Sequence, residues 1–237
     1  NKIKQFIVRT ELPIIIKAAS GGGGKGMRII KDYSELDKST DAAKLEAKKS
    51  FNDDTVYIEK FLTSPKHIEI QILSDAHGNV VTLGERDCSI QYKHQKLLEE
   101  CPSTILNEKQ RDQISSLCIK ATKSIGYEGV GTFEFLYDDG NFYFMEMNTR
   151  LQVEHPVTEM GTGVDLIKQQ IKMHAGLECP GVLNDFQLRC QAIECRINAE
   201  DPTNNFMPFP GEITSFHMPG GKGVRVDSHA YAGYDIT

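Results

Sequence analysis

Several features that would assign a chain to a class at once are missing from this sequence. No apolar run approaches the roughly 18 residues that a membrane-spanning helix needs. Aspartate and glutamate (33) outnumber lysine and arginine (27), and the net charge of −6 argues against nonspecific nucleic-acid binding. The six cysteines include no CxxC pair, which argues against a zinc site and favours free thiols. A phosphate ligand remains compatible with this composition, because it needs only a local cluster of cations.

The composition itself is that of a globular protein with a sizeable core: 237 residues, 39% hydrophobic and 25% charged. Periodicity predicts more strands than helices, and most connections suggest hairpins, so we expect an α+β fold with antiparallel sheets. The expected strands are 12–19, 27–30, 56–62, 67–73, 80–85, 132–137, 142–148 and 189–199, and the expected helices are 34–50, 108–125 and 163–175. Residues 88–103 are polar with little periodicity. A change of composition near 179–187 is the expected domain boundary, and the strand 189–199 is expected to open the next unit.

Four consecutive glycines, Gly21 to Gly24, stand between two predicted strands and are followed by Lys25 and Gly26. A dinucleotide-binding fingerprint needs a helix directly after the glycines, and a P-loop needs Ser or Thr after the lysine, so neither motif fits. What fits is a hairpin tip whose backbone N–H groups approach phosphates, with Lys17 adding charge at its base. An ordinary surface turn is the alternative.

Two glutamates, Glu134 and Glu146, lie on the strands of a predicted hairpin around the turn DDGN. A two-residue turn puts the two carboxylates on opposite faces, whereas a three-residue turn puts them directly opposite each other. Facing carboxylates repel each other unless a cation lies between them or their pKa values differ. With the amide oxygen of Asn148 they form an all-oxygen set suited to magnesium. A solvated strand face is the alternative.

Five blocks of sequence together closely resemble biotin carboxylase, the ATP-grasp component of biotin-dependent carboxylases. They are SGGGGKGMRI after Lys17, EKF with HIEIQ, GERDCSIQ with HQK, EMNTRLQVEHPVTE, and AIECRINAEDP, and they follow the family's order along the whole chain. The resemblance implies an ATP-grasp fold with a lid subdomain (1–62), a main subdomain (63–180) and part of a C-terminal domain (181–237). It also implies a chain truncated at both ends relative to the family.

The resemblance implies a role for each residue that matches a family motif. Expected ATP-binding residues are Lys17, Gly22, Gly23, Gly24, Glu59, Lys60, Leu62, His67, Gln91 and His94. Glu134, Glu146 and Asn148 are expected to hold magnesium or manganese. Bicarbonate is expected to lie among Lys96, Arg150, Gln152, Val153 and Glu154, with Lys96 and Arg150 acting in catalysis and Glu154 as the base. Arg196 is expected to meet the ureido oxygen of biotin. Tyr92 departs from the family, which has an arginine there.

The implied activity is the ATP- and bicarbonate-dependent carboxylation of biotin on a biotin carboxyl carrier protein, by way of carboxyphosphate. The motifs look most like acetyl-CoA carboxylase of fatty acid biosynthesis, and the pyruvate, propionyl-CoA and methylcrotonyl-CoA carboxylases remain alternatives. The implied partners are the carrier, a carboxyltransferase and a second copy of the chain, with no nucleic acid or membrane. The implied location is the cytoplasm of a bacterium, or the mitochondrion or plastid of a eukaryote.

Other readings remain for the whole chain and for single residues. Another ATP-grasp ligase, such as carbamoyl-phosphate synthetase, and a non-catalytic nucleotide-binding module are the two competing functions. Among single residues, His67 could simply begin a strand and Arg196 could make an ordinary salt bridge. Lysines such as Lys93 and Lys96 could be solvated surface.

The stretch FMEMNTRLQVEHP carries a polar side chain at every second position from Glu146 to Glu154. A straight strand would spread these two residues over roughly 27 Å, at about 3.3 Å per residue. One magnesium, phosphate and bicarbonate site cannot span that length. We therefore expect the strand to end or bend within residues 149–151.

Overall fold

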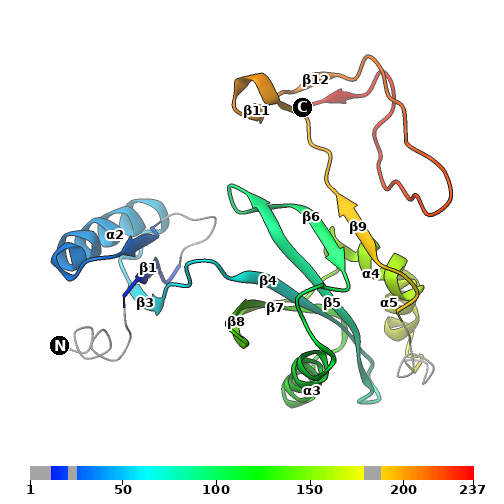
Figure 1. Cartoon of the computed structure of the whole chain (residues 1–237), viewed down its shortest axis with the longest axis horizontal. Coiled ribbons are helices and arrows are strands. Elements are labelled where there is room, and N and C mark those ends of the chain that lie inside the picture. The colour runs from blue at the N-terminus through cyan, green and yellow to red at the C-terminus, as the bar shows by residue number, and fades with distance from the viewer. Residues whose placement is uncertain (1–11, 21–25, 179–187) are drawn as a thin grey trace. The chain divides into compact units, whose positions relative to one another are not determined.

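The computed structural model describes residues 12–20, 26–178 and 188–237. Contacts divide the chain into two units, Asn1–Cys195 and Arg196–Thr237. The first unit is built around a six-stranded sheet in which every neighbouring pair is antiparallel (Figure 1). Its strands, in spatial order, are β8 (Asn141–Asn148), β7 (Gly129–Asp138), β4 (Lys66–Ser74), β5 (Val80–Tyr92), β6 (Gln95–Cys101) and β9 (Ala192–Cys195).

The alternation HIEIQIL in β4 separates an apolar face of the sheet from a polar one. Ile68, Ile70 and Ile72 pack with Ile114 and Cys118 of helix α3 (Glu108–Ile125). The other face holds Leu73, which packs with residues of helix α5 (Leu166–His174), and it also carries Glu69 and Gln71. Because side chains alternate along a strand, Glu69 and Gln71 lie on the same face as Leu73, and both are buried.

Helix α3 follows its sequence signals closely. Asn107 caps the N-terminus in a capping box with Gln110, and Gly126 ends the helix in the left-handed conformation. The expected bounds of this helix, 108–125, are confirmed. Helix α4 (His155–Thr162), which contacts β5, β6 and β9, was not expected from the sequence, because a helix of only 8 residues leaves little periodicity to detect.

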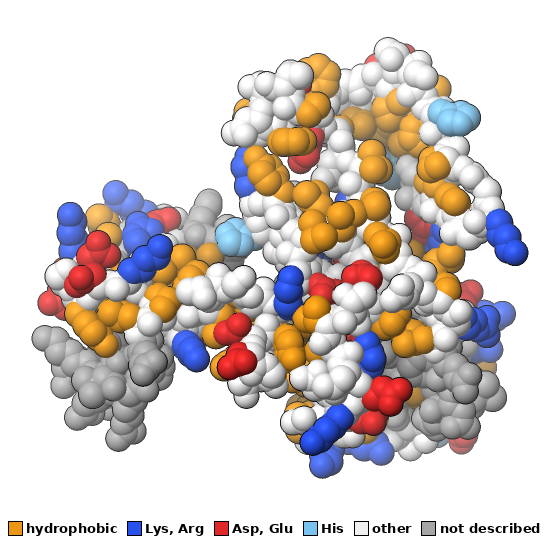
Figure 2. Space-filling model, viewed as in Figure 1, with side chains coloured by type: hydrophobic (Ala, Val, Ile, Leu, Met, Phe, Trp, Pro, Cys, Tyr) orange, Lys and Arg blue, Asp and Glu red, His pale blue; other side chains and the backbone are white. Residues whose placement is uncertain are grey.

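A smaller three-stranded sheet carries the flanks of the glycine run. Its order is β2 (Arg28–Ile30), β1 (Ile14–Ala18) and β3 (Val56–Lys60), all antiparallel. A short 3₁₀ turn (Tyr33–Glu35) leads into helix α2 (Leu36–Phe51), whose buried alanines pack on this sheet. Figure 2 shows basic and acidic side chains mixed over the outer surface of α2. The helix is therefore the solvated outer layer of this part.

The β7–β8 hairpin combines the two registers that the sequence left open. Its turn contains two residues, Asp139 and Gly140, both with positive φ, as a type I′ turn requires. Phe135 therefore pairs with Phe144. A β-bulge then inserts one extra residue into β8, so that Glu134 nevertheless faces Glu146. Of the two turn lengths that were left open, the two-residue turn is present, and the two glutamates are nevertheless paired.

Two other expectations are corrected by the sheet. Residues 88–103, in which no strand was expected, contain the end of β5 and all of β6, joined by a turn at Lys93 and His94, both with positive φ. Polar side chains of β6 such as Lys96 and Glu99 are half-buried or buried rather than exposed, which hides the strand pattern. The strand expected over 189–199 is only Ala192–Cys195, and it pairs with β6 as an edge of the main sheet instead of opening another unit.

The second unit contains two small two-stranded sheets. One pairs β10 (Glu200–Asp201) with β11 (Met207–Pro208) around a 3₁₀ turn (Pro202–Asn204), and the other pairs β12 (Gly211–Glu212) with β13 (Asp235–Ile236). None of residues 196–237 is buried, so these residues form no hydrophobic core among themselves. The expected boundary at 179–187 lies outside the described residues, and the three-domain division stays a prediction.

None of the described helices is long and apolar enough to cross a membrane.

Replacing Gly140 by alanine tests the hairpin turn. Gly140 has φ of +80°, a conformation that costs an L-residue about 1 kcal/mol or more, although a Cβ there would meet no other atom. We expect Gly140→Ala to lower the free energy of unfolding by about 1 kcal/mol in urea denaturation. Gly220→Ala, at an equally open position without positive φ, is the control and should change little. Equal effects of the two substitutions would contradict the turn assignment.

Candidate active site

One row of ionisable side chains crosses four strands of the main sheet. Glu146 of β8 is paired with Glu134 of β7, Glu134 with Glu69 of β4, and Glu69 with Arg86 of β5. Directly paired residues lie on the same face of a sheet, so three carboxylates and one guanidinium follow one another. Glu69 and Arg86 are fully buried, and Glu134 is nearly so. Such a row needs cations close to the carboxylates.

Lys96 of β6 is one of those cations. Its Nζ donates to Glu69, lies 3.1 Å from Oε1 of Glu134 and lies 2.6 Å from Oε1 of Glu154. Burial lowers the pKa of Lys96, but the charges of Glu69 and Glu154 outweigh it and raise the pKa above its usual value. Lys96 is therefore a protonated cation among three carboxylates, and not the solvated surface lysine of the alternative reading.

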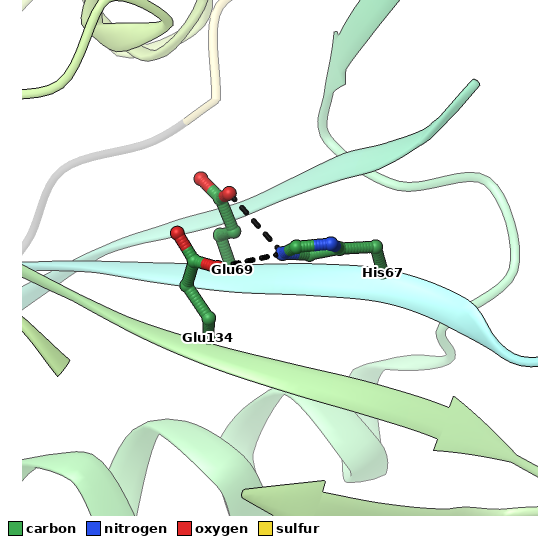
Figure 3. A group of neighbouring side chains, drawn as sticks. All are labelled: His67, Glu69 and Glu134. Carbon is green, nitrogen blue, oxygen red and sulfur yellow. Dashed lines mark ion pairs between the residues drawn. The ribbon is translucent and has the colours of Figure 1, made fainter. Parts of the chain in front are cut away.

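His67 is the second cation of the buried cluster that contains Glu69, Glu134, Glu154 and Lys96 (Figure 3). Its Nε2 lies 3.0 Å from Oε2 of Glu134 and 3.4 Å from Oε1 of Glu69. Burial lowers the pKa of His67, but the contacts with Glu134 and Glu69 raise it to about 9. Nε2 of Gln91 lies 3.0 Å from Nδ1 of His67, so the structure brings these two expected ATP-site residues together.

The third cation is Arg86, which lies in the block GERDCSIQ but for which no role was predicted. It donates through Nε and Nη2 to Oε2 of Glu69, at 3.0 and 2.9 Å. Burial raises the pKa of Glu69, but Arg86, His67 and Lys96 together hold it well below its usual range. The pKa of Arg86 is raised, because the nearby carboxylates, Glu69 first, outweigh the effect of burial. A pairing rule could have found Arg86, since it lies opposite Glu69 once β5 is extended past residue 85.

The end of β8 behaves as the spacing predicted. The strand stops at Asn148, residues 149–154 turn, and α4 begins at His155. The expected bend is confirmed. The turn returns Glu154 and Gln152 to the cluster, and both are buried. Nε2 of Gln152 donates to Oε1 of Glu134 at 2.8 Å. Arg150 and Val153 are exposed, and Arg150 donates to the carbonyl of Leu151 at 3.3 Å.

The three residues expected to bind magnesium fit a hard cation by their donor atoms and placement. Glu134 faces Glu146 across the hairpin, and Asn148 is two residues further along the same face, with its Nδ2 2.7 Å from Oε1 of Glu134. Glu146 is exposed, which leaves this carboxylate accessible from solvent. Among the described residues, ligand atoms within 4.8 Å of one another occur in two other groups: His67, Glu69 and Glu134, and Glu69, Cys88 and Glu154. The three-residue magnesium site stays a prediction.

The expected ATP-binding residues of the smaller sheet lie on adjacent strands. Lys17 of β1 forms an ion pair with Glu59 of β3 at 2.5 Å, and Leu62 is buried just after β3. Lys60 lies over the ring of Tyr143, 5.7 Å from its centre. Gly22, Gly23 and Gly24 lie outside the described residues. His94 is an exposed turn residue between β5 and β6, and Arg196 is the first residue of the second unit.

Comparison with known proteins identifies the family. Residues 1–181 match the family model described as the carbamoyl-phosphate synthase L chain, ATP binding domain. The chain belongs to this ATP-binding family. Residues 194–237 match a second model, the biotin carboxylase C-terminal domain. The resemblance to biotin carboxylase that the sequence blocks carried is confirmed, and so is the α+β ATP-grasp fold.

Relatives of this ATP-grasp chain include biotin carboxylases and components of larger carboxylases. It is 54% identical to the biotin carboxylase of Haemophilus influenzae over 99% of this chain and 52% of the relative. It is 53% identical to a pyruvate carboxylase subunit of Methanothermobacter thermautotrophicus over 94% of this chain and 46% of the relative. The chain spans about half the length of the curated relatives it matches.

A solved structure agrees with the fold. The biotin carboxylase domain of 2-oxoglutarate carboxylase from Hydrogenobacter thermophilus, a dimer in complex with MgADP, ADP and bicarbonate, superposes with a TM-score of 0.90. The sequences are 48% identical, and the match covers 100% of this chain and 52% of that one.

The charge state of His67 gives a direct test of the cluster. Because its pKa is raised from 6.5 to about 9, protonated His67 stabilises the folded ATP-grasp protein fully below about pH 6.5. That contribution is lost as the pH rises through about 9. NMR titration of the imidazole nitrogens in magnesium-free buffer should show a midpoint near 9, and Glu134→Gln should lower it. A midpoint at or below 6.5 in the unsubstituted protein would contradict the ion pairs.

Proposed function

We propose that the complete protein carboxylates biotin on a biotin carboxyl carrier protein, using ATP and bicarbonate. The observation that carries this proposal is the 2.6 Å contact between Lys96 and Glu154, in a buried cluster that also contains Gln152 and Glu134. A protonated lysine binds the anion, and a buried carboxylate beside it accepts the proton that bicarbonate must lose. The bicarbonate complex of the Hydrogenobacter thermophilus relative supports the same anion.

In this account Glu154 removes the hydroxyl proton of bicarbonate, whose oxygen then attacks the γ-phosphate of ATP. Lys96 and the amide of Gln152 hold the anion against Glu154. Arg150 is an exposed residue of the same turn as Gln152 and Glu154, and its planar guanidinium matches a planar anion. The products of this step are carboxyphosphate and ADP. Burial of Glu154 and Gln152 keeps water away from the reacting oxygens.

The smaller sheet and the row of carboxylates provide the nucleotide site. Lys17 contacts the ATP phosphates, Glu59 and Lys60 meet the edge of the adenine, and Leu62 lines the base. His67 and Gln91 lie by the ribose and phosphates, with His94 and the glycine loop completing the site. Glu134, Glu146 and Asn148 would hold magnesium or manganese, which neutralises charge on the transferring phosphoryl group.

Biotin accepts the carboxyl group in the second part of the reaction. Carboxyphosphate breaks down to CO2 and phosphate, and the phosphate takes the proton from N1 of biotin. The ureido oxygen becomes negative as that proton leaves, and the guanidinium of Arg196 stabilises it. N1 then attacks CO2 and gives carboxybiotin.

The final carboxyl acceptor is decided elsewhere. We propose acetyl-CoA, as the first step of fatty acid biosynthesis, with a carboxyltransferase as the partner and a homodimer as the assembly. Pyruvate is the main alternative, since the pyruvate carboxylase relative is nearly as similar as the biotin carboxylases. Propionyl-CoA and methylcrotonyl-CoA also remain, and the 2-oxoglutarate carboxylase relative adds a further keto acid.

The role of Glu154 is tested by Glu154→Gln in the complete protein. Removing the base should reduce bicarbonate-dependent ATP hydrolysis in the presence of free biotin by at least about 100-fold, the scale of a general base. Glu128→Gln, a matched change at an exposed glutamate, is the control and should leave the rate unchanged. Carboxybiotin formation that survived Glu154→Gln would remove Glu154 from the mechanism.

The role of Arg196 is separable from that of Glu154. Arg196→Ala should keep bicarbonate-dependent ATP hydrolysis measured without biotin, because bicarbonate activation does not use Arg196. It should lose the stimulation by free biotin and the formation of carboxybiotin, measured with ¹⁴C-bicarbonate. An equal loss of both reactions would place Arg196 in the ATP or bicarbonate step, and retention of both would exclude it from either.

A further inference from the structure

The fully buried Arg86 connects four parts of the chain around the cluster. Its five N–H groups make six donor contacts with five side chains, because Nη2 has three acceptors for its two hydrogens. These side chains belong to β4, β7, the turn 149–154 and helix α4. Its side chain is 0% exposed, so it does not contact a ligand that enters from solvent. On the basis of the proposed function, we propose that Arg86 is a positioning residue for bicarbonate. It fixes the amide of Gln152, and it shares the carboxylate of Glu69 with Lys96.

The first contact sets the orientation of the Gln152 amide. Nη2 of Arg86 donates to Oε1 of Gln152 at 2.8 Å, and a guanidinium has no acceptor atom. The amide oxygen must therefore face Arg86. The amide nitrogen then faces the cluster, where it donates to Oε1 of Glu134 at 2.8 Å. Arg86 thus decides that Gln152 presents N–H groups, and not its oxygen, to an anion.

The second contact divides Glu69 between two cations. Both Arg86 bonds go to Oε2, while Lys96 bonds to Oε1. With Arg86 removed, the buried charge of Glu69 would be balanced mainly by Lys96 and His67. Lys96 would then be held by Glu69 more strongly and would be less free for Glu154 and bicarbonate. Arg86 keeps Lys96 available by neutralising Glu69 from the other side.

The third contact fixes helix α4, which follows the turn 149–154. Nη1 of Arg86 donates to Oγ1 of Thr158 at 3.0 Å and to Oε1 of Gln71 at 2.6 Å. Thr158 lies in the first turn of α4, four residues after Glu154, so this bond ties the end of the turn to β4 and β5. A lysine has three donors and no planar fork, so it cannot replace these contacts.

Arg86→Lys in the complete protein tests the proposal. The KM for bicarbonate in ATP hydrolysis should rise about tenfold or more, the scale seen when residues supporting a site are changed. The KM for ATP should stay within about twofold, because none of the acceptors of Arg86 is an expected nucleotide ligand. A rise in both KM values by the same factor, or an unchanged KM for bicarbonate, would overturn the proposal.

Arg111→Lys is the matched control, because Arg111 also pairs with a buried glutamate. Its Nε lies 2.7 Å from Oε1 of Glu85, and this pair joins α3 to β5 away from the cluster. The control should lose stability in the same way, with no change in the KM for bicarbonate. An equal rise of that KM in both variants would show that stability alone is responsible and would overturn the proposal.

If Arg86→Lys does not fold, the substitution Thr158→Val tests the proposal instead. Thr158→Val keeps the shape of the side chain and removes one acceptor of Arg86. The KM for bicarbonate should rise roughly threefold, as expected for one hydrogen bond, with the KM for ATP unchanged. An unchanged KM for bicarbonate would overturn the proposal.

Failure of the proposed function would be seen in the unsubstituted protein, as an absence of bicarbonate-dependent ATP hydrolysis. Arg86 is then judged by crystal structures of the unsubstituted protein and of Arg86→Lys, which lacks the Nη2 bond to Gln152. A Gln152 amide that turns away from Glu134 only in the variant supports positioning by Arg86. An unmoved Gln152 overturns it.

Discussion

The buried ion pair between Arg86 and Glu69 is the interaction on which the candidate site depends. Three carboxylates, Glu69, Glu134 and Glu154, converge in a place with little solvent, and each would be unstable there without a cation. Arg86, Lys96 and His67 supply matching positive charges. Removing one partner of such a pair leaves an uncompensated buried charge, which costs several kcal/mol. The network therefore holds together as a unit.

The strand register brings these groups together, and only part of it could be predicted. Asp139 and Gly140 indicate a two-residue turn by themselves, because Asp-Gly favours type I′. Taken alone, that turn would have separated Glu134 from Glu146. The bulge in β8 restores their pairing, and nothing in the local sequence marks it, since it depends on how β8 packs against β7. The two glutamates are paired although the turn has two residues.

Residues with local signals were predicted well, and residues that depend on distant partners were not. Helix α3 has a capping box and a terminal glycine. The end of the strand at Asn148 follows from comparing the length of a straight strand with the size of one site. Arg86 and Glu69 lie in the blocks GERDCSIQ and HIEIQ, but they form a pair only through the register of β4 with β5, so no role was predicted for either. The hairpin of β5 and β6 was missed for a related reason: its inward face is polar, and polarity in a strand reads as solvent exposure. Strand β9 pairs with β6, which lies far from it in the sequence, so no local pattern indicates this pairing either.

The central claim is that this cluster makes bicarbonate attack the γ-phosphate of ATP, and isotope transfer tests it most directly. The complete protein would be incubated with ATP, magnesium, biotin and ¹⁸O-labelled bicarbonate, and the phosphate released would be analysed by mass spectrometry. The account predicts that phosphate carries one ¹⁸O atom from bicarbonate, because the attacking oxygen stays with phosphorus when carboxyphosphate breaks down. Phosphate without label, formed at the same rate, would mean that water attacks ATP, and would contradict the account.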